Sequence, residues 1–269
     1  MSFFRMPETL ASEKNPLLKE VRRAIARGSL TDDGLAVAEG FHLLEEALRS
    51  RCEVAAIIAS SSVKDEFLAQ APKSATRVVQ VSDQIFKTLT STEAPQGVIS
   101  LVRPPDWTIE HLFGPLPLIV AIDGIQDPGN AGAIVRAAEA FRASGVAFLK
   151  GSADPYNPKA LRASAGSIFR LPVIAGIEAN AFAAELERKR VPVYAALPHA
   201  ERLISGLDLS SPCALVIGGE GHGVSETLRR ACLGARIPTR GVESLNAAVA
   251  AGVILYEACR QRAKCHEPV

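Results

Sequence analysis

The stretch IDGIQDPGNAGAIVRAAEAF, residues 122–141, joins a strand-like apolar run to a helix-like pattern through a turn of Pro, Gly and Asn. Two later stretches, LVIGGEGHGVSETL at 215–228 and IPTRGVESLNAAVAAGVILYE at 237–257, follow the same order of strand, turn and helix. Turns of this kind collect backbone N–H groups that no strand or helix uses. In α/β proteins they meet at the sheet edge where ligands bind. The three stretches therefore predict one ligand site.

The rest of the chain predicts an α/β fold in two domains. In the second half, the short apolar runs VAFLKG, RLPVIAG, VPVYAAL and CALVIGG alternate with helical patterns, which is typical of βαβ units around a mostly parallel sheet. The first half mixes the helix-like LLKEVRRAIAR and EGFHLLEEALRS with the strand-like VAAIIAS, RVVQVS and GVISLV. The proline-rich segment 102–117 separates the two halves. We expect a small α/β domain at 1–104 and a larger one at 105–269.

Composition limits the partners of the chain. Its 30 basic and 29 acidic residues give a formal net charge of +1, so an anionic partner must be held by a local basic patch. The five cysteines are scattered and form no CxxC pair, which indicates neither a disulfide framework nor a structural zinc site. The N-terminus lacks a signal-peptide core, and no apolar run approaches the ~20 residues that span a bilayer. We expect a cytoplasmic protein with no membrane partner and no metal.

Two readings of the first stretch stay open. Asn130 is a good N-cap residue, and Arg136 falls about two turns into the following helix. In one reading, Asn130 only caps the helix and Arg136 is a solvated surface residue. In the other, both side chains face a ligand at the carboxyl edge of the sheet.

The second stretch lacks the GK[ST] ending and the GxGxxG spacing of phosphate loops. Its glycines let the backbone approach a ligand closely and fix one carboxylate, Glu220, among them. Its His222 has no metal-ligand spacing to another His or Cys, which favours a surface turn. In the third stretch, Ser244 and Asn246 are helix caps or ligand contacts, and the Ala-rich helix suits either a buried core or a subunit interface.

The ordered trio of NxGxxxR, GGEGxG and IPxxGxxSLNxxxAxxxxLYE resembles the three motifs of the SpoU/TrmH family of RNA 2′-O-ribose methyltransferases, in the SPOUT superfamily. The segment NPKALRASAGSIFRLPV at 157–173 resembles the family's connecting element. The phrases VAEGFHLLEEAL and QGVISLV resemble the substrate-binding domain that precedes many such enzymes. The resemblance covers nearly the whole chain. One departure is Ala247-Ala248, where many members have Val-Ser after the SLN of the third motif.

The resemblance implies a deep trefoil knot in 105–269, S-adenosyl-L-methionine as cofactor and a homodimer. It also implies RNA as substrate, with ribosomal RNA ahead of tRNA; a non-catalytic RNA-binding member is the alternative. Positions matching the catalytic neighbourhood are Asn130, Arg136, Glu220, Ser244 and Asn246. Positions matching the cofactor pocket are Gly218, Gly219, Ile237, Leu245 and Asn246, with Ala195, Ala196 and Leu197 added from the end of a strand.

A basic cluster near the N-terminus is the candidate RNA contact. It comprises Lys14, Lys19, Arg22, Arg23 and Arg27, and we expect Glu20 alone to oppose these charges. Helical spacing spreads these residues over more than one face. The alternative is an ordinary solvated helix, which is the usual position of a charge run.

Overall fold

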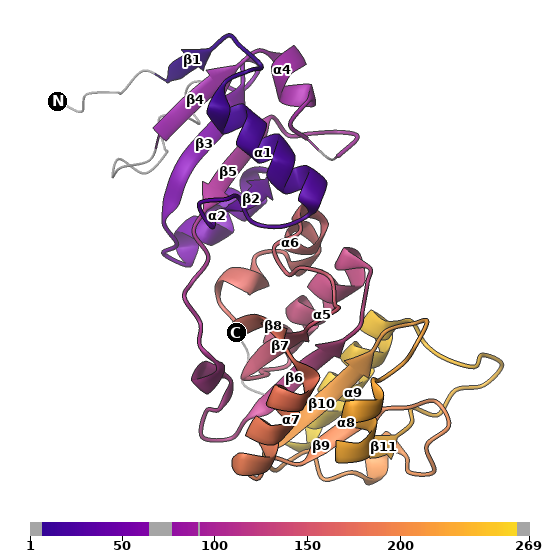
Figure 1. Cartoon of the computed structure of the whole chain (residues 1–269). Helices are drawn as coiled ribbons and strands as arrows, with labels where there is room; N and C mark the ends of the chain where they lie inside the picture. Colours follow the sequence, from indigo (N-terminus) through magenta and orange to yellow (C-terminus); the bar gives the residue numbers. More distant parts are fainter. Residues whose placement is uncertain (1–6, 65–76, 91, 263–269) are drawn as a thin grey trace. The chain divides into compact units, whose positions relative to one another are not determined.

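The computed structural model describes residues 7–64, 77–90 and 92–262, and the chain divides into two compact units (Figure 1). The first comprises Met1–Pro105 and Tyr156–Phe169, and the second comprises Asp106–Pro155 and Arg170–Val269. The sequence did not indicate that Tyr156–Phe169 packs with the first unit. The assignment of residues 1–104 to RNA binding and of residues 105–269 to methyl transfer stays a prediction.

The first unit is built on a five-stranded sheet in the order β1-β4-β3-β5-β2. β1, β4 and β3 are mutually parallel, whereas β5 is antiparallel to both β3 and β2. The strands are β1 (Glu8–Leu10), β2 (Ala36–Glu39), β3 (Val54–Ser60), β4 (Arg77–Val81) and β5 (Val98–Val102). The helices are α1 (Pro16–Arg27), α2 (Phe41–Arg49), α4 (Asp83–Lys87), α6 (Pro158–Ser164) and the 3₁₀ turn η2 (Ser167–Phe169).

Helix α1 shows why this sequence folds as it does. Asn15 caps its first turn, because the side chain accepts a hydrogen bond from the N–H of Leu17. Leu18, Val21 and Ala24 recur every third residue and are fully buried against the sheet. Lys19, Arg23 and Arg27 are exposed on the remaining surface of the helix, so the amphipathic pattern buries the apolar stripe and leaves these charges in solvent.

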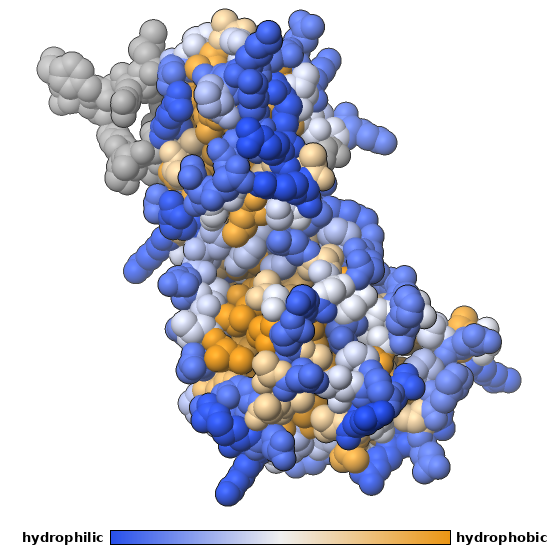
Figure 2. Space-filling view, viewed as in Figure 1, coloured by the Kyte–Doolittle hydropathy of each residue, from blue (hydrophilic) through white to orange (hydrophobic). Residues whose placement is uncertain are grey.

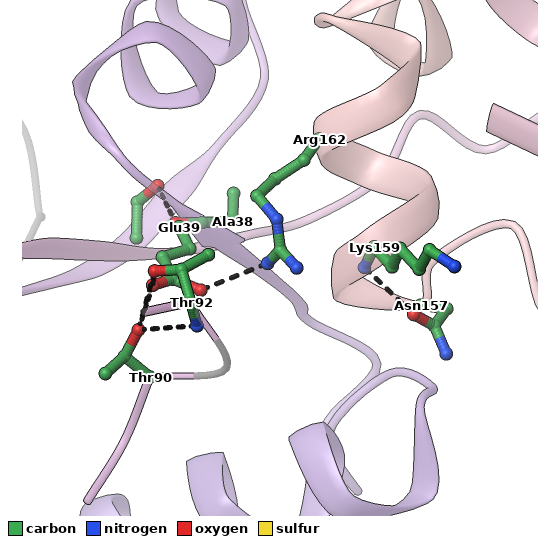
Figure 3. A network of polar contacts seen from close by, with 8 residues as sticks. Ala38, Glu39, Thr90, Thr92, Asn157, Lys159 and Arg162 are labelled. Atoms are coloured by element: carbon green, nitrogen blue, oxygen red, sulfur yellow. Dashed lines mark hydrogen bonds and ion pairs between the residues drawn. The ribbon is translucent and has the colours of Figure 1, made fainter. Parts of the chain in front are cut away.

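A buried carboxylate ties α6 to the first unit (Figure 3). Glu39, at the end of β2, has a side chain that is only 5% exposed, and its Oε2 pairs with Arg162 Nη1 of α6 at 3.1 Å. Its Oε1 accepts hydrogen bonds from the hydroxyls of Thr90 and Thr92. Removing one partner of a buried ion pair leaves an uncompensated charge, at a cost of about 3–5 kcal/mol. Arg162 therefore joins α6 to the sheet of this unit.

The second unit contains a six-stranded parallel sheet in the order β11-β9-β10-β6-β7-β8. The apolar runs of the sequence form five of these strands, as expected, but the short β11 was not predicted. The strands are β6 (Leu118–Asp123), β7 (Gly145–Leu149), β8 (Val173–Ile177), β9 (Val193–Ala196), β10 (Cys213–Gly218) and β11 (Leu233–Ala235). The central β6 is completely buried, as continuous apolar strands of parallel sheets are.

Helices flank this sheet, and the pair α5 and α9 pack against each other (Figure 1). Phe141, the C-cap residue of α5, meets Tyr256 of α9 edge to face, with ring centroids 6.0 Å apart. The helical elements are η1 (Ile109–Leu112), α5 (Pro128–Ala140), α7 (Ala179–Arg188), η3 (Ile204–Gly206), α8 (Glu226–Ala231) and α9 (Ala247–Gln261). The mixed α/β fold class is therefore as expected; the trefoil knot stays a prediction.

The cap of α5 differs from the prediction. Asp127, not Asn130, is the N-cap residue: its Oδ1 accepts the N–H of Asn130 at 2.8 Å. Pro128 occupies the first helical position, where its missing N–H costs nothing. Asn130 therefore lies within the first turn, and its side chain is released for other contacts.

Two expectations from composition can be compared with the structure. No helix in the ranges described is both long and apolar enough to span a bilayer. Cys52, Cys213 and Cys232 are free, whereas Cys259 is disulfide-bonded, which the cysteine spacing did not indicate.

Candidate active site

Two glycine-containing loops meet at the carboxyl ends of β6 and β10. A Cβ atom on Gly218 would lie 2.4 Å from the carbonyl carbon of Gly223, and one on Gly219 would lie 2.4 Å from the oxygen of Gly124. No real side chain tolerates such distances, so the backbones approach closely only because these residues are glycine. The loop after β10 is thereby held against the loop after β6. This contact brings Glu220 beside the first turn of α5.

Three side chains from the three motifs form one hydrogen-bonded cluster. Glu220 Oε1 accepts a hydrogen bond from Asn130 Nδ2 and another from Asn246 Nδ2, both at 3.0 Å. Asn246 Nδ2 also donates to Asn130 Oδ1 at 3.1 Å. A carboxylate only accepts hydrogen bonds, so both amides must turn their nitrogens towards Glu220. The sequence-predicted residues Asn130, Glu220 and Asn246 are thus in direct contact.

The hydrogen-bonding atoms of the Asn246 side chain are already used within the protein. Its Oδ1 accepts the N–H groups of Ala248 and Val249, at 3.0 and 3.3 Å, and caps α9. Its Nδ2 has two hydrogens, which serve Asn130 and Glu220. The side chain therefore locks the start of α9 to the other two motifs. Asn246 is therefore not suited to bind the ribose directly.

Asn130 and Glu220 keep hydrogen-bonding capacity. Asn130 uses one of its two amide hydrogens on Glu220. In the described part of the chain, the second carboxylate oxygen of Glu220, Oε2, has no hydrogen-bond partner. Glu220 is exposed and also lines the adjoining pocket. The cluster thus presents a negative charge and an amide donor to a ligand.

Arg136 lies on α5, two turns after the helix start, and is exposed. Within residues 7–64, 77–90 and 92–262 its guanidinium makes no hydrogen bond or ion pair. In particular, no ion pair joins it to Glu220, whose Oε1 is occupied by the two amides. Glu220 therefore does not orient Arg136 in this structure, and the guanidinium is available to an external anion.

A pocket lies beside the cluster, at the carboxyl ends of β9 and β10, and residues of the third motif form part of its wall. Apolar and small side chains form most of its wall, which also includes two residues with hydroxyl groups, Thr239 and Ser244, and two with carboxylates, Glu220 and Glu243. It is lined by Ala196, Leu197, Pro198, Ile217, Gly218, Gly219, Glu220, Gly223, Ala235, Ile237, Thr239, Glu243, Ser244, Leu245, Ala247 and Ala250. Such a wall suits a small organic ligand that has both apolar rings and polar groups.

Most residues assigned to the cofactor from the sequence line this pocket: Ala196, Leu197, Gly218, Gly219, Ile237 and Leu245. The other two do not. Ala195 is buried in the core of the unit, because adjacent strand residues point to opposite faces and Ala196 takes the outward position. Asn246 caps α9 instead.

Sequence reasoning missed eight lining residues: Pro198, Ile217, Gly223, Ala235, Thr239, Glu243, Ala247 and Ala250. Several of these, such as Thr239 and Glu243, lie inside the third motif, so their position was the available signal. Ala235 belongs to β11, which was not foreseen. Among the residues described, no group of three or more His, Cys, Asp or Glu side chains is arranged to hold a metal.

The basic cluster on α1 is more strongly neutralised than its sequence indicated. Arg23 and Arg27 both pair with Asp32, at 3.3 and 2.8 Å, because the chain after the helix folds back along it. The expectation that Glu20 is the one opposing charge is therefore wrong. Arg22 donates to the hydroxyl of Thr88 and to the main-chain oxygen of Glu13.

The two lysines of the cluster differ from the arginines. Lys14 and Lys19 are exposed, and their ammonium groups have no partner in the ranges described. They are therefore the members of the cluster that remain available to an external anion.

Family models match both parts of the chain. Residues 117–256 match the SpoU rRNA Methylase family, and residues 15–100 match the MRM3-like substrate binding domain. The 23S rRNA (guanosine(2553)-2′-O)-methyltransferase RlmP of Bacillus subtilis (strain 168) is 32% identical over 252 residues, covering 92% of this chain and 97% of its own.

Two solved structures are also similar over most of their length. The SpoU methyltransferase AviRb of Streptomyces viridochromogenes, in complex with the cofactor AdoMet, has a TM-score of 0.83 at 26% identity and covers 93% of this chain and 99% of its own. The AdoMet-bound rRNA methyltransferase of Sinorhizobium meliloti has a TM-score of 0.79 at 27% identity, covering 94% and 97%. This chain belongs to the SpoU rRNA methylase family.

Proposed function

We propose that this protein methylates a ribose 2′-hydroxyl in structured RNA, with ribosomal RNA as the substrate and S-adenosyl-L-methionine as the methyl donor. The observation that carries the proposal is the cluster of Glu220, Asn130 and Asn246 at the mouth of a small-molecule pocket. The relatives whose names specify a 23S rRNA 2′-O-methyltransferase support the choice of RNA.

The pocket fits the methyl donor chemically. Leu197, Ile237 and Leu245 offer apolar surface for an adenine ring, and the absence of side chains at Gly218 and Gly219 lets a ligand approach the backbone closely. Glu220 places a carboxylate at the same wall, which suits a positively charged sulfur. The donor, when bound, supplies an electrophilic methyl group on its sulfonium.

Alignment is the largest contribution that the residues can make. Holding a nucleophile in near-attack geometry is worth ~7–11 kcal/mol, more than the 10²–10⁴-fold that a single acid–base contact supplies. The free amide hydrogen of Asn130 and the exposed hydroxyl of Ser244 can position the ribose and the donor. Asn246 holds Asn130 and Glu220 in register for this task.

Arg136 contributes as a cation. A guanidinium stays protonated in proteins, so it is a poor general base but a good bidentate partner for a phosphate next to the reacting ribose. It also stabilises negative charge that develops on the 2′-oxygen. The proton then passes to substrate phosphate or water. The exposure and free donors of Arg136 support this role.

We propose that the protein works as a homodimer through α9. Val249, Val253 and Tyr256 recur at spacings of four and three, so they lie on one face of the helix, and they are 53%, 39% and 58% exposed. Exposed apolar side chains that form one stripe favour a protein–protein contact. Apart from this stripe, Figure 2 shows hydrophobic residues gathered among hydrophilic ones on the visible face of the second unit.

The first unit is the proposed RNA-binding part, in line with its match to a substrate-binding domain. Lys14, just before α1, and Lys19, on α1, are the proposed phosphate contacts, with the arginines contributing less because they already have partners. A cytoplasmic location follows from the proposed ribosomal substrate.

The test combines methyl transfer with mapping. Purified protein is incubated with S-adenosyl-L-methionine carrying a labelled methyl group and with ribosomal RNA or tRNA from cells lacking the protein. We expect label at one ribose of ribosomal RNA, located by its resistance to alkaline cleavage. Donor binding without methyl transfer to either RNA would favour a non-catalytic RNA-binding protein, and transfer to tRNA alone would reassign the substrate.

A further inference from the structure

The loop that carries Glu220 is held at both ends by one residue, Asp123. Asp123 is the last residue of β6 and is only 6% exposed. Its main-chain oxygen accepts the N–H of Gly219 at 2.9 Å, and its side-chain Oδ2 accepts the N–H of Ser225 at 2.7 Å. One residue of the neighbouring strand therefore fixes the first and the last residue of the segment 219–225.

Between these two bonds, Val224 is buried in the core of the unit, and the residues before it depend on main-chain contacts. Gly223 donates its N–H to the oxygen of Gly219 at 2.8 Å and closes the loop across its neck. Residues 218, 219, 221 and 223 are glycine, which has the widest backbone freedom and loses the most entropy on being fixed. Glu220 lies inside this closed loop, so its position depends on the bonds at the neck.

The buried carboxylate of Asp123 costs free energy unless it is hydrogen-bonded. Burying an ionised carboxyl group is unfavourable, and a buried charge is normally retained where it is hydrogen-bonded. The short bond to the N–H of Ser225 is charge-assisted and stronger than a neutral one. Packing alone would be served by an apolar residue, as at the other positions of β6.

We infer that Asp123 is a positioning residue for the proposed methyl transfer, acting through the loop that carries Glu220. It does not touch the reacting atoms. Its carboxylate holds the loop closed so that Glu220 Oε1 stays within reach of Asn130 and Asn246. This inference depends on the proposed function only for its catalytic consequence, because the closure of the loop is measurable by itself.

The experiment compares Asp123→Ala with Asp123→Asn in the full chain. Asn keeps an oxygen acceptor for Ser225, whereas Ala removes it. A second variant, Ser225→Pro, removes the N–H donor and leaves Asp123 intact; the φ of Ser225, −57°, suits proline. Asp208→Ala is the matched control, since that carboxylate orders Ser210 and Ser211 before the opposite end of β10.

Three quantities are measured: amide hydrogen exchange at Gly219 and Gly223, the Kd for S-adenosylmethionine, and the single-turnover rate of methyl transfer. In Asp123→Ala and Ser225→Pro we expect faster exchange and a rate lowered by roughly 10-fold or more, with Asp123→Asn within about threefold of wild type. The control should match wild type in all three.

Two results would overturn the inference. One is unchanged exchange at Gly223 together with a wild-type rate in Asp123→Ala or, if that variant does not fold, in Ser225→Pro. The other is an Asp123→Asn protein as defective as Asp123→Ala. If the wild type neither binds the donor nor methylates RNA, the proposed function fails, and hydrogen exchange still decides whether Asp123 closes the loop.

Discussion

Asn246 donates a hydrogen bond to Asn130 across 3.1 Å, although 116 residues separate them in the chain. The same amide group donates to Glu220, and its oxygen caps α9. The side chain of Asn246 thus joins the start of α9 to α5, against which α9 packs, and to the glycine loop that carries Glu220. Its role is to assemble the site, which leads to a prediction that separates folding from catalysis.

Asn246→Asp should keep the helix cap but lose the site. An aspartate still accepts the N–H groups of Ala248 and Val249, so the melting temperature should change by only a few degrees. It cannot donate, and its second oxygen would face the oxygen of Glu220. We expect a loss of methyl transfer of at least about 10-fold. Thermal melting and single-turnover kinetics measure the two effects.

Asn246→Ala is the matched comparison, because it loses both roles. Loss of the cap should destabilise it by about 1 kcal/mol in addition to the loss of activity. Equal activity of Asn246→Asp and wild type would contradict the assembling role.

The fold was largely predictable because its signals are local. Continuous apolar runs such as 118–123 and 213–218 are strands buried on both faces, and the pattern alone indicates this. The predicted N-cap of α5 was wrong because Asp127 and Asn130 are both residue types that cap helices. Pro128, at the first helical position, indicates that the helix starts earlier.

The remaining errors concern contacts between distant residues. Asp32 neutralises Arg23 and Arg27 only because the chain reverses after α1. Likewise, no pattern within Tyr156–Phe169 shows which of two cores will bury it. The site residues could be predicted from the order of the motifs. That both the amide nitrogen and the oxygen of Asn246 are already hydrogen-bonded could be seen only from the structure.

Arg136→Ala should abolish methyl transfer while leaving donor binding and stability nearly unchanged. The side chain is exposed and makes no contact in the described chain that its removal would break. Arg136→Lys should also be poor, because a point charge does not reproduce the planar fork of a guanidinium. Calorimetric titration with S-adenosylmethionine and an RNA methylation assay measure the two properties. Full activity of Arg136→Ala would remove its assigned role.

A fragment of residues 106–269 should be poorly soluble, because it carries Tyr156–Phe169 without the unit that buries it. Ala160, Leu161, Ile168 and Phe169 are at most 2% exposed in the whole chain. Replacing 156–169 by a Gly/Ser linker should restore a soluble fragment that binds the methyl donor but has lost most of its RNA affinity. Sedimentation and calorimetry compare the two. A soluble, donor-binding fragment without the replacement would show that 156–169 does not need the first unit.

Acid should weaken the end of α9 through Glu257. Hydrogen bonds from Arg260 and then from Gln261 lower the pKa of this carboxyl from 4.5 to about 2. A group with a lowered folded-state pKa stabilises the protein above its unfolded pKa, and this stability is lost as pH falls from about 4.5 towards 2. The difference in melting temperature between wild type and Glu257→Gln should therefore shrink across that window. A difference that is constant with pH would contradict the assignment.

The basic cluster on α1 can be tested by separating its lysines from its arginines. Lys14 and Lys19 have free ammonium groups, so replacing both by Ala should weaken RNA binding and reduce the magnitude of the log K versus log salt slope by roughly 1 to 2, at about 0.7 per phosphate contact on single strands. Arg22→Ala with Arg23→Ala should instead lower thermal stability, because Arg22 bonds Thr88 and Glu13 and Arg23 pairs with Asp32. Its effect on the slope should be smaller, since Asp32 already compensates the charge of Arg23 and the guanidinium of Arg22 is held by Thr88 and Glu13. RNA titrations at several salt concentrations, with melting curves for both double variants, measure the two quantities. An unchanged slope in the lysine variant would place the RNA on another surface of the protein.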